Sequence, residues 1–189
     1  MNKTTKWLTL TLLSALMAVS QQAWGQTTLF ESKKATGQSV YRIPSIVRLP
    51  SSGNLWAFCD MRYDNNGNDL GNNHRIDVVG KLSSDNGSSW GTQQDIAKGN
   101  SNSSGYDFAH GDPASVVDRE SGRIMVLSAS GKSGWGSNDA PLIARSLSTD
   151  NGSNWTKSEI TSQLYVSGFN PQSIFFSSGR MIQSSLVKK

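Results

Sequence analysis

Ser83-Ser84-Asp85-Asn86-Gly87-Ser88-Ser89-Trp90 and Ser148-Thr149-Asp150-Asn151-Gly152-Ser153-Asn154-Trp155 are two copies of one octapeptide. Asp-Asn-Gly is typical of a tight turn, because the Asp side chain accepts backbone N–H groups and glycine adopts positive φ without strain. Each copy follows an apolar run, 76–82 or 142–147, that predicts a strand. A turn residue recurs with each structural unit, whereas a catalytic residue occurs once, so we expect structural roles for Asp85, Gly87, Trp90, Asp150, Gly152 and Trp155.

The sequence around the octapeptides repeats as well. Each copy is preceded by a predicted hairpin of two strands and a glycine-containing turn, and a third such hairpin follows the second copy. The predicted strand pairs are 41–49 with 55–60, 113–117 with 124–129, and 172–176 with 181–187. A four-stranded unit that repeats every ~40–70 residues is typical of the blades of a β-propeller. A β-sandwich with a coincidental repeat of one turn is the alternative.

Composition supports an all-β fold and excludes several other classes. The 189 residues are only 35% hydrophobic and 17% charged, with 18 glycines, which disfavours a helical bundle or a coiled coil. Regular apolar bursts argue against disorder. The net charge of +4 includes Lys3, Lys6, Lys188 and Lys189 at the chain ends. No stretch combines clustered Lys and Arg with aromatic residues, so we expect no nucleic-acid partner.

The first 25 residues have the pattern of a secretory signal peptide. Lys3 and Lys6 precede an apolar run at 8–19, and Ala23 and Gly25 supply the small residues of a cleavage site. The alternative, a membrane anchor, is disfavoured because a spanning helix needs ~20 apolar residues. We therefore expect cleavage after Gly25, a mature domain of residues 26–189, no stable membrane span, and export to the periplasm, the cell surface or the medium.

The number of predicted units is too small for a closed ring. About two and a half units fit into the chain, whereas propellers close with about four to eight blades. We therefore expect this chain to be the N-terminal part of a longer protein. The one cysteine, Cys59, lies in an apolar run and offers no disulfide framework.

Several segments resemble the sialidase (neuraminidase) family. The octapeptides resemble its Asp-boxes, and Tyr41-Arg42-Ile43-Pro44 resembles its Phe/Tyr-Arg-Ile-Pro motif. Asp60-Met61-Arg62-Tyr63 with the later Asp69 and Ile76-Asp77 resembles a second stretch, and residues 112–117 resemble a third. The resemblance implies a six-bladed β-propeller and an exo-α-sialidase that hydrolyses terminal sialic acids of glycoproteins, glycolipids or oligosaccharides. It implies no cofactor.

The resemblance also implies roles for individual residues. Arg42 is one of three arginines that bind the carboxylate of sialic acid, a task that suits the planar fork of a guanidinium. Asp69 is the acid/base, with Asp64 as the second candidate because the loop is one residue longer than usual. Arg62 and Asp112 line the sugar pocket or form a structural ion pair, and Trp135 stacks on the sugar or packs at the rim.

The remaining parts of a sialidase site are not found in this sequence. Sialidases use a Tyr nucleophile, with a Glu beside it, and two further arginines, which the family places later in the chain. None of the tyrosines here lies in the nucleophile's context, so we expect the chain alone to be inactive. A trans-sialidase and a non-catalytic, glycan-binding Asp-box propeller are the alternatives. The loop that begins at Asp64 has Asp69 at the sixth position, where an EF-hand needs Gly, and no Glu at the twelfth. His74 and His110 stand singly in predicted loops, so no metal site is expected.

Overall fold

A computed structural model describes residues 27–33, 39–63, 70, 74–132, 142–165, 167–168, 174–176 and 179–185. Within these ranges the chain is nearly all β, with one short helix, α2 (Thr161–Leu164). The strands are β1 (Val40–Arg48), β2 (Leu55–Arg62), β3 (Ile76–Ser83), β4 (Gln94–Ala97), β5 (His110–Val117), β6 (Ile124–Ser130), β7 (Leu142–Ser148), β8 (Thr156–Glu159) and β9 (Gly179–Arg180). The all-β prediction is confirmed for this part of the chain.

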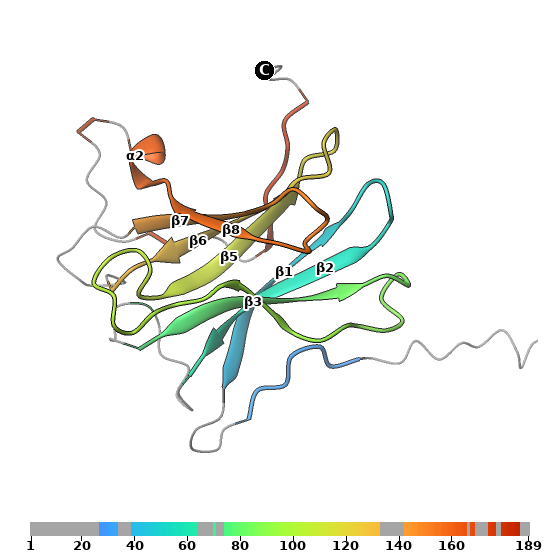
Figure 1. Cartoon of the computed structure of the whole chain (residues 1–189), viewed down its shortest axis with the longest axis horizontal. Helices are drawn as coiled ribbons and strands as arrows, with labels where there is room; N and C mark the ends of the chain where they lie inside the picture. Colours follow the sequence, from blue (N-terminus) through green and yellow to red (C-terminus); the bar gives the residue numbers. More distant parts are fainter. Residues whose placement is uncertain are drawn as a thin grey trace, which may run out of the picture.

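Two antiparallel meanders form the core of the structure. The first sheet has the order β1-β2-β3-β4, and the second has the order β8-β7-β6-β5 with β9 added beside β5. Figure 1 shows the two sheets lying face to face. The first two predicted hairpins are confirmed as β1–β2 and β5–β6, and each octapeptide connects the third strand of its sheet to the fourth.

The third predicted hairpin is not seen in the described residues. Residues 174–176 and 181–185 are not strands, and β9 has only two residues. β9 pairs in parallel with Ala114 and Ser115 of β5 instead of forming an antiparallel hairpin. The physical reason is that β5 presents unpaired backbone groups at the edge of its sheet, which a nearby extended segment satisfies. The expectation of a further half blade is therefore not confirmed.

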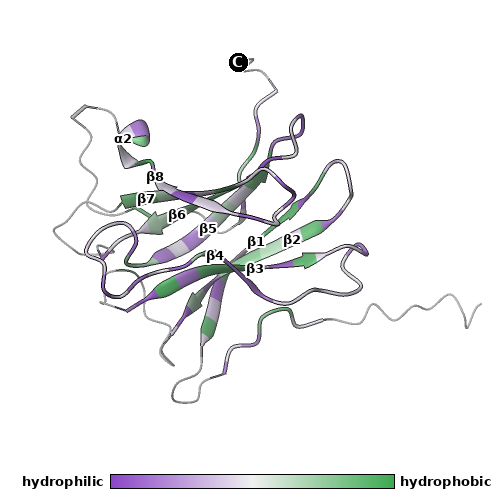
Figure 2. Cartoon of the chain, viewed as in Figure 1, coloured by the Kyte–Doolittle hydropathy of each residue, from purple (hydrophilic) through white to green (hydrophobic). Residues whose placement is uncertain are grey.

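The main hydrophobic core lies between the two sheets. Trp56, Phe58 and Val78 of the first sheet pack in one cluster with Ile124 and Val126 of the second. Trp56 and Phe58 are fully buried and stacked at a ring distance of 5.6 Å. Figure 2 shows hydrophobic residues concentrated in the strands and hydrophilic residues in the connecting turns. Burial of these large side chains holds one sheet against the other.

The outer face of the first sheet is covered by the N-terminal segment. Phe30 and Tyr41 pack against Cys59, Met61 and Val79, and Phe30 lies 5.4 Å from Tyr41 between ring centres. No helix among the residues described above is long and apolar enough to cross a membrane. The predicted signal peptide, residues 1–25, lies outside the described residues.

The two octapeptides fold into the same turn. In the first, the Ser83 hydroxyl donates to Asp85 Oδ1 at 2.8 Å, and the same oxygen accepts the backbone N–H of Ser89 at 2.8 Å. In the second, the Ser148 hydroxyl donates to Asp150 Oδ1 at 2.8 Å, and the backbone N–H of Asn154 donates to the same oxygen at 2.9 Å. Hydrogen bonds from the side chain and backbone of Ser89, and then from Ser83, lower the pKa of Asp85 to about 2. Those from Asn154 and Ser148 lower the pKa of Asp150 to about 2. Both carboxylates therefore act as acceptors within their own turns.

The second turn also joins the two sheets. Trp56 of β2 donates its indole N–H to the backbone oxygen of Asn151 at 3.0 Å. Trp155 meets the rings of Trp56 and Phe58 edge-on, each at 5.8 Å. Gly152 is buried in this contact. The turn of the second sheet thus packs directly on the first sheet.

Candidate functional site

Two related β-bulges occur in β1 and β5, the first strand in the chain of each sheet. In β1 the register with β2 shifts between Arg42 and Ser45, and in β5 the register with β6 shifts between Gly111 and Ala114. Ile43 and Asp112 both have positive φ, 53° and 54°, and both precede a proline. Proline has no N–H for the ladder, so a bulge is where a sheet accommodates it. The bulges lie next to Arg42 and at Asp112, two residues predicted for the site.

Asp60 of β2 is the centre of a buried charge cluster between these bulges. It is fully buried, and its Oδ2 accepts Arg62 Nη2 at 2.8 Å. The backbone N–H of Asp112 donates to the same oxygen at 3.4 Å. Asp60 is also the cross-strand partner of Arg42 in the β1–β2 ladder. The carboxylate of Asp60 therefore contacts two residues that the sequence assigned to the site, Arg62 and Asp112, and its backbone pairs with the third, Arg42.

The pKa of Asp60 is raised, and burial is the largest cause. The hydrogen bond and charge of Arg62 oppose this shift, as does the charge of Arg42. Removing a carboxylate from water disfavours its ionised form, whereas a cation within a few ångströms favours it. The pair of Asp60 and Arg62 is therefore a costly buried ion pair rather than a surface salt bridge.

Arg42 and Arg62 differ in exposure. The Arg62 side chain is 3% exposed and lies 4.0 Å from Asp112 Oδ1 as well as 2.8 Å from Asp60. Arg42 is exposed. Of the two guanidinium groups, that of Arg42 is the one that a solute can reach. Arg62 forms ion pairs with Asp60 and Asp112 in this structure. A structural ion pair was one of the two roles that the sequence left open for Arg62 and Asp112.

The loop residues assigned to catalysis fall outside the described part of the chain. These are Asp69, Asp64 and Trp135. The neighbour of Asp69 in the chain, Leu70, is described and buried. A Cβ placed on Gly111 would lie 3.4 Å from Leu70 Cδ1 and 3.6 Å from Asp60 Oδ2. Leu70 is thus anchored beside the Asp60 cluster.

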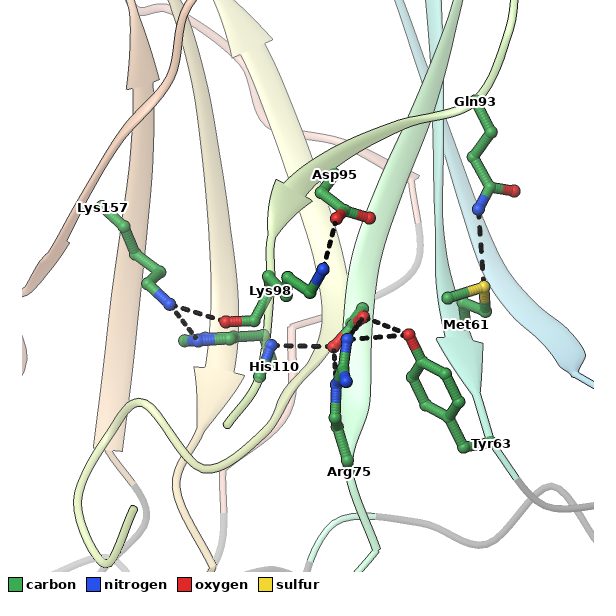
Figure 3. A network of polar contacts seen from close by, with 10 residues as sticks. Met61, Tyr63, Arg75, Gln93, Asp95, Lys98, His110 and Lys157 are labelled. Atoms are coloured by element: carbon green, nitrogen blue, oxygen red, sulfur yellow. Dashed lines mark hydrogen bonds and ion pairs between the residues drawn. The ribbon is translucent and has the colours of Figure 1, made fainter. Parts of the chain in front are cut away.

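A second buried carboxylate, Asp77 of β3, organises a separate polar network (Figure 3). Tyr63 donates its hydroxyl to Asp77 Oδ2 at 2.6 Å, and Arg75 Nε donates to Oδ1 at 2.9 Å. Arg75 also lies over the Tyr63 ring at 4.4 Å, and Gly99 N–H donates to Asp77 at 2.7 Å. Burial and the Asp77 carboxylate raise the pKa of Tyr63. A phenol that retains its proton in this way is unsuited to be a nucleophile.

His110 lies in a third network, at the start of β5 rather than in the predicted loop. Its ring is fully buried, with Nε2 3.2 Å from Lys157 Nζ of β8. Lys157 also donates to the backbone oxygen of Lys98 at 2.7 Å (Figure 3). Burial, and secondly the charge of Lys157, lower the pKa of His110 to about 4, so the imidazole is neutral at pH 7. Within the described ranges, no three His, Cys, Asp or Glu side chains are grouped to hold a metal ion.

A cavity of about 460 Å³ lies elsewhere, on the outer face of the first sheet. Its lining includes Phe30, Tyr41, Lys81 and Gln93. None of the residues predicted for the site lines it. The site residues combine a buried ion pair, Asp60 with Arg62, and an exposed arginine, Arg42, on the strand beside it, and this chemistry is more specific for a ligand than the shape of the cavity. We therefore place the candidate site at the bulges and not in the cavity.

Sequence reasoning missed the roles of Asp60 and Asp77. Asp60 interrupts the apolar run that begins at Trp56, and a charged residue in a run predicted to be a buried strand is itself a signal of a buried ion pair. Asp77 likewise lies inside the buried strand β3. Their partners were not predictable, because the contact from Asp60 to Asp112 spans 52 residues of sequence.

Two four-stranded meanders with repeated turns define an all-β protein, and Arg42 and Arg62, near the bulges of β1 and β5, form a candidate anion site. No model of a protein family matches the chain, and a search of curated proteins gives no match. Solved structures of sialidases do match.

A Hadza microbial sialidase is 26% identical over 74% of this chain and 29% of its own length, with a TM-score of 0.54. The NanB sialidase of Streptococcus pneumoniae is 14% identical over 87% of this chain and 42% of its own, with a TM-score of 0.62. An intramolecular trans-sialidase of Ruminococcus gnavus is 14% identical over 82% of this chain and 54% of its own, with a TM-score of 0.54. The two sheets therefore share the fold of part of these sialidases, and the chain spans between about a third and about half of their length.

Proposed function

We propose that this chain belongs to an exo-α-sialidase, which removes terminal sialic acids from glycoproteins, glycolipids or oligosaccharides. The observation that carries the proposal is the exposed Arg42, held at the bulge of β1 opposite the buried pair of Asp60 and Arg62. The likeness to solved sialidases supports the same reading. The whole protein would be a six-bladed propeller in which the octapeptides are Asp-boxes.

Arg42 would bind the carboxylate of the sugar. A terminal sialic acid carries a carboxylate on its anomeric carbon, and a guanidinium donates two parallel hydrogen bonds to such a group. Lysine has a single ammonium and lacks this fork. Arg62 and Asp112 would form the wall of the pocket behind Arg42, and Trp135 would contact the sugar.

Asp69 would act as the acid/base. Its neighbour Leu70 is buried beside Gly111 and close to Asp60, which ties this end of the loop to the cluster. The nucleophilic Tyr, its Glu and two further arginines would come from outside this sequence, so the chain alone would bind sugar without cleaving it. Export with removal of residues 1–25 agrees with a substrate on extracellular glycans.

A trans-sialidase is the second candidate, favoured by the likeness to the intramolecular trans-sialidase of Ruminococcus gnavus. Both reactions begin with the same bound sialoside, and they differ in the group that accepts the sialyl unit. Product analysis separates them, because hydrolysis gives free sialic acid and an intramolecular transfer gives an anhydro sugar. A non-catalytic glycan-binding propeller would give neither product.

The proposal is tested by titrating N-acetylneuraminic acid into the 189-residue chain and following the backbone amides by NMR. We expect weak binding that Arg42→Ala lowers by at least tenfold and that Arg42→Lys does not restore. Arg48→Ala is the matched control, because Arg48 is also exposed on β1 but lies at its other end. An unmodified chain that shows no binding, or an Arg42→Ala variant that binds equally well, would contradict the proposal.

A further inference from the structure

Asp60 carries an oxygen that no described residue uses. Oδ2 accepts Arg62 and the backbone N–H of Asp112, but Oδ1 is buried and has no hydrogen-bond partner among the described residues. Leaving a buried charged acceptor without a hydrogen bond is more costly than leaving a neutral acceptor unsatisfied. Neighbouring positions in β2 are filled by apolar residues such as Phe58. The position of Asp60 therefore calls for an explanation beyond packing.

The residue directly opposite Asp60 is Arg42. The two are paired across the β1–β2 ladder, and the charge of Arg42 favours the ionised form of Asp60. Directly opposite residues of an antiparallel pair have Cβ atoms about 4.5–5.5 Å apart, within reach of an aspartate and an arginine. A guanidinium has five N–H donors in one plane. A bound carboxylate uses two of them, and the remainder can be held from the protein side.

We propose that Asp60 is the positioning residue of the site: its Oδ1, unused by the described residues, accepts a hydrogen bond from the guanidinium of Arg42 when Arg42 binds the ligand carboxylate. This inference rests on the proposed function, since the ligand is taken to be a sialic acid. Asp60 also neutralises the buried Arg62, which keeps the wall of the pocket in place. Asp60 does not touch the sugar.

The direction in which Asp60→Asn changes the affinity for sialic acid shows whether Asp60 positions Arg42 or only lies near it. Asp60 is an anion near the binding place of another anion. If it were only a neighbour, Asp60→Asn would remove a repulsion and leave binding of sialic acid equal or tighter. If it positions Arg42, the same substitution weakens binding, because the arginine is no longer held for its bidentate contact.

The experiment compares the unmodified chain with Asp60→Asn by the same NMR titration. We expect at least a tenfold loss of affinity for N-acetylneuraminic acid and little change for its methyl ester, which lacks the charge that Arg42 recognises. Asp95→Asn, with the same change of charge at an exposed position of β4, is the control and should bind as the unmodified chain does. Amide spectra establish that each variant is folded.

A double variant covers the case in which Asp60→Asn does not fold. Asp60→Asn with Arg62→Gln removes both buried charges and leaves the net charge of the chain unchanged. Positioning predicts the same tenfold loss, whereas proximity predicts no change. Equal or tighter binding by either folded variant overturns the inference and leaves the proposed function standing. Failure of the unmodified chain to bind sialic acid overturns both.

Discussion

Gly152→Ala and Gly87→Ala form a matched pair, because the two glycines occupy the same place in two copies of one turn. Their φ angles are 92° and 90°, so a side chain strains the backbone equally at both, by about 1–2 kcal/mol. A Cβ on Gly152 would lie 2.4 Å from Trp56 Cζ2, whereas the nearest atom to one on Gly87 is 3.6 Å away, on Leu55. Trp56 is fully buried and cannot move aside into solvent.

We therefore expect Gly152→Ala to cost about 1–3 kcal/mol more than Gly87→Ala, the usual penalty for overpacking a core. Urea unfolding followed by tryptophan fluorescence measures the difference in the free energy of unfolding. Adding Trp56→Phe should remove the excess, because the indole atoms that meet the new methyl group are then absent. Equal losses for the two alanine variants would refute the view that the second turn anchors one sheet on the other.

Three further outcomes are expected. The pKa of His110 is about 4 in the folded chain, whereas its unfolded value is near 6.5. Between these two pH values the unfolded chain binds one more proton, so the free energy of unfolding should fall by up to about 3 kcal/mol as the pH drops through the interval. Urea titrations at several pH values would measure this slope, and His110→Gln should abolish it. Asp77→Asn should cost about 1–3 kcal/mol by weakening the hydrogen bonds that the buried carboxylate accepts from Tyr63, Arg75 and Gly99, which thermal unfolding would show against Asp95→Asn. Under the proposed function, Asp69→Ala in a protein that contains this chain and cleaves sialosides should slow natural sialosides far more than activated aryl sialosides; equal losses would direct attention to Asp64.

Local chemistry was enough to predict the sheets. Asp-Asn-Gly turns and alternating apolar residues determine the strands on both sides of them. The predicted ends of the strands in the hairpins β1–β2 and β5–β6 differ from the observed ends by at most three residues. The third hairpin, predicted within 172–187, is not seen among the described residues, where Gly179 and Arg180 pair with the free edge of β5 instead. Turn chemistry cannot tell which partner an extended segment meets.

The site was predictable in part. Motif resemblance brought together Arg42, Arg62 and Asp112, and the structure places all three around Asp60. Resemblance could not show that Arg62 is buried while Arg42 is exposed. That difference depends on how β5 lies against β2, which is a matter of long-range packing and not of local sequence.

The arrangement of the sheets has a consequence for folding kinetics. Every antiparallel pairing joins strands that are consecutive in sequence, so each sheet needs only short loops to close. The bond from Trp56 to Asn151, in contrast, spans 95 residues. During synthesis the first sheet can form on its own, with one face of Trp56 uncovered until the second turn has left the ribosome. Docking of the two sheets must wait for that turn, and in the interval the uncovered face of Trp56 is open to aggregation.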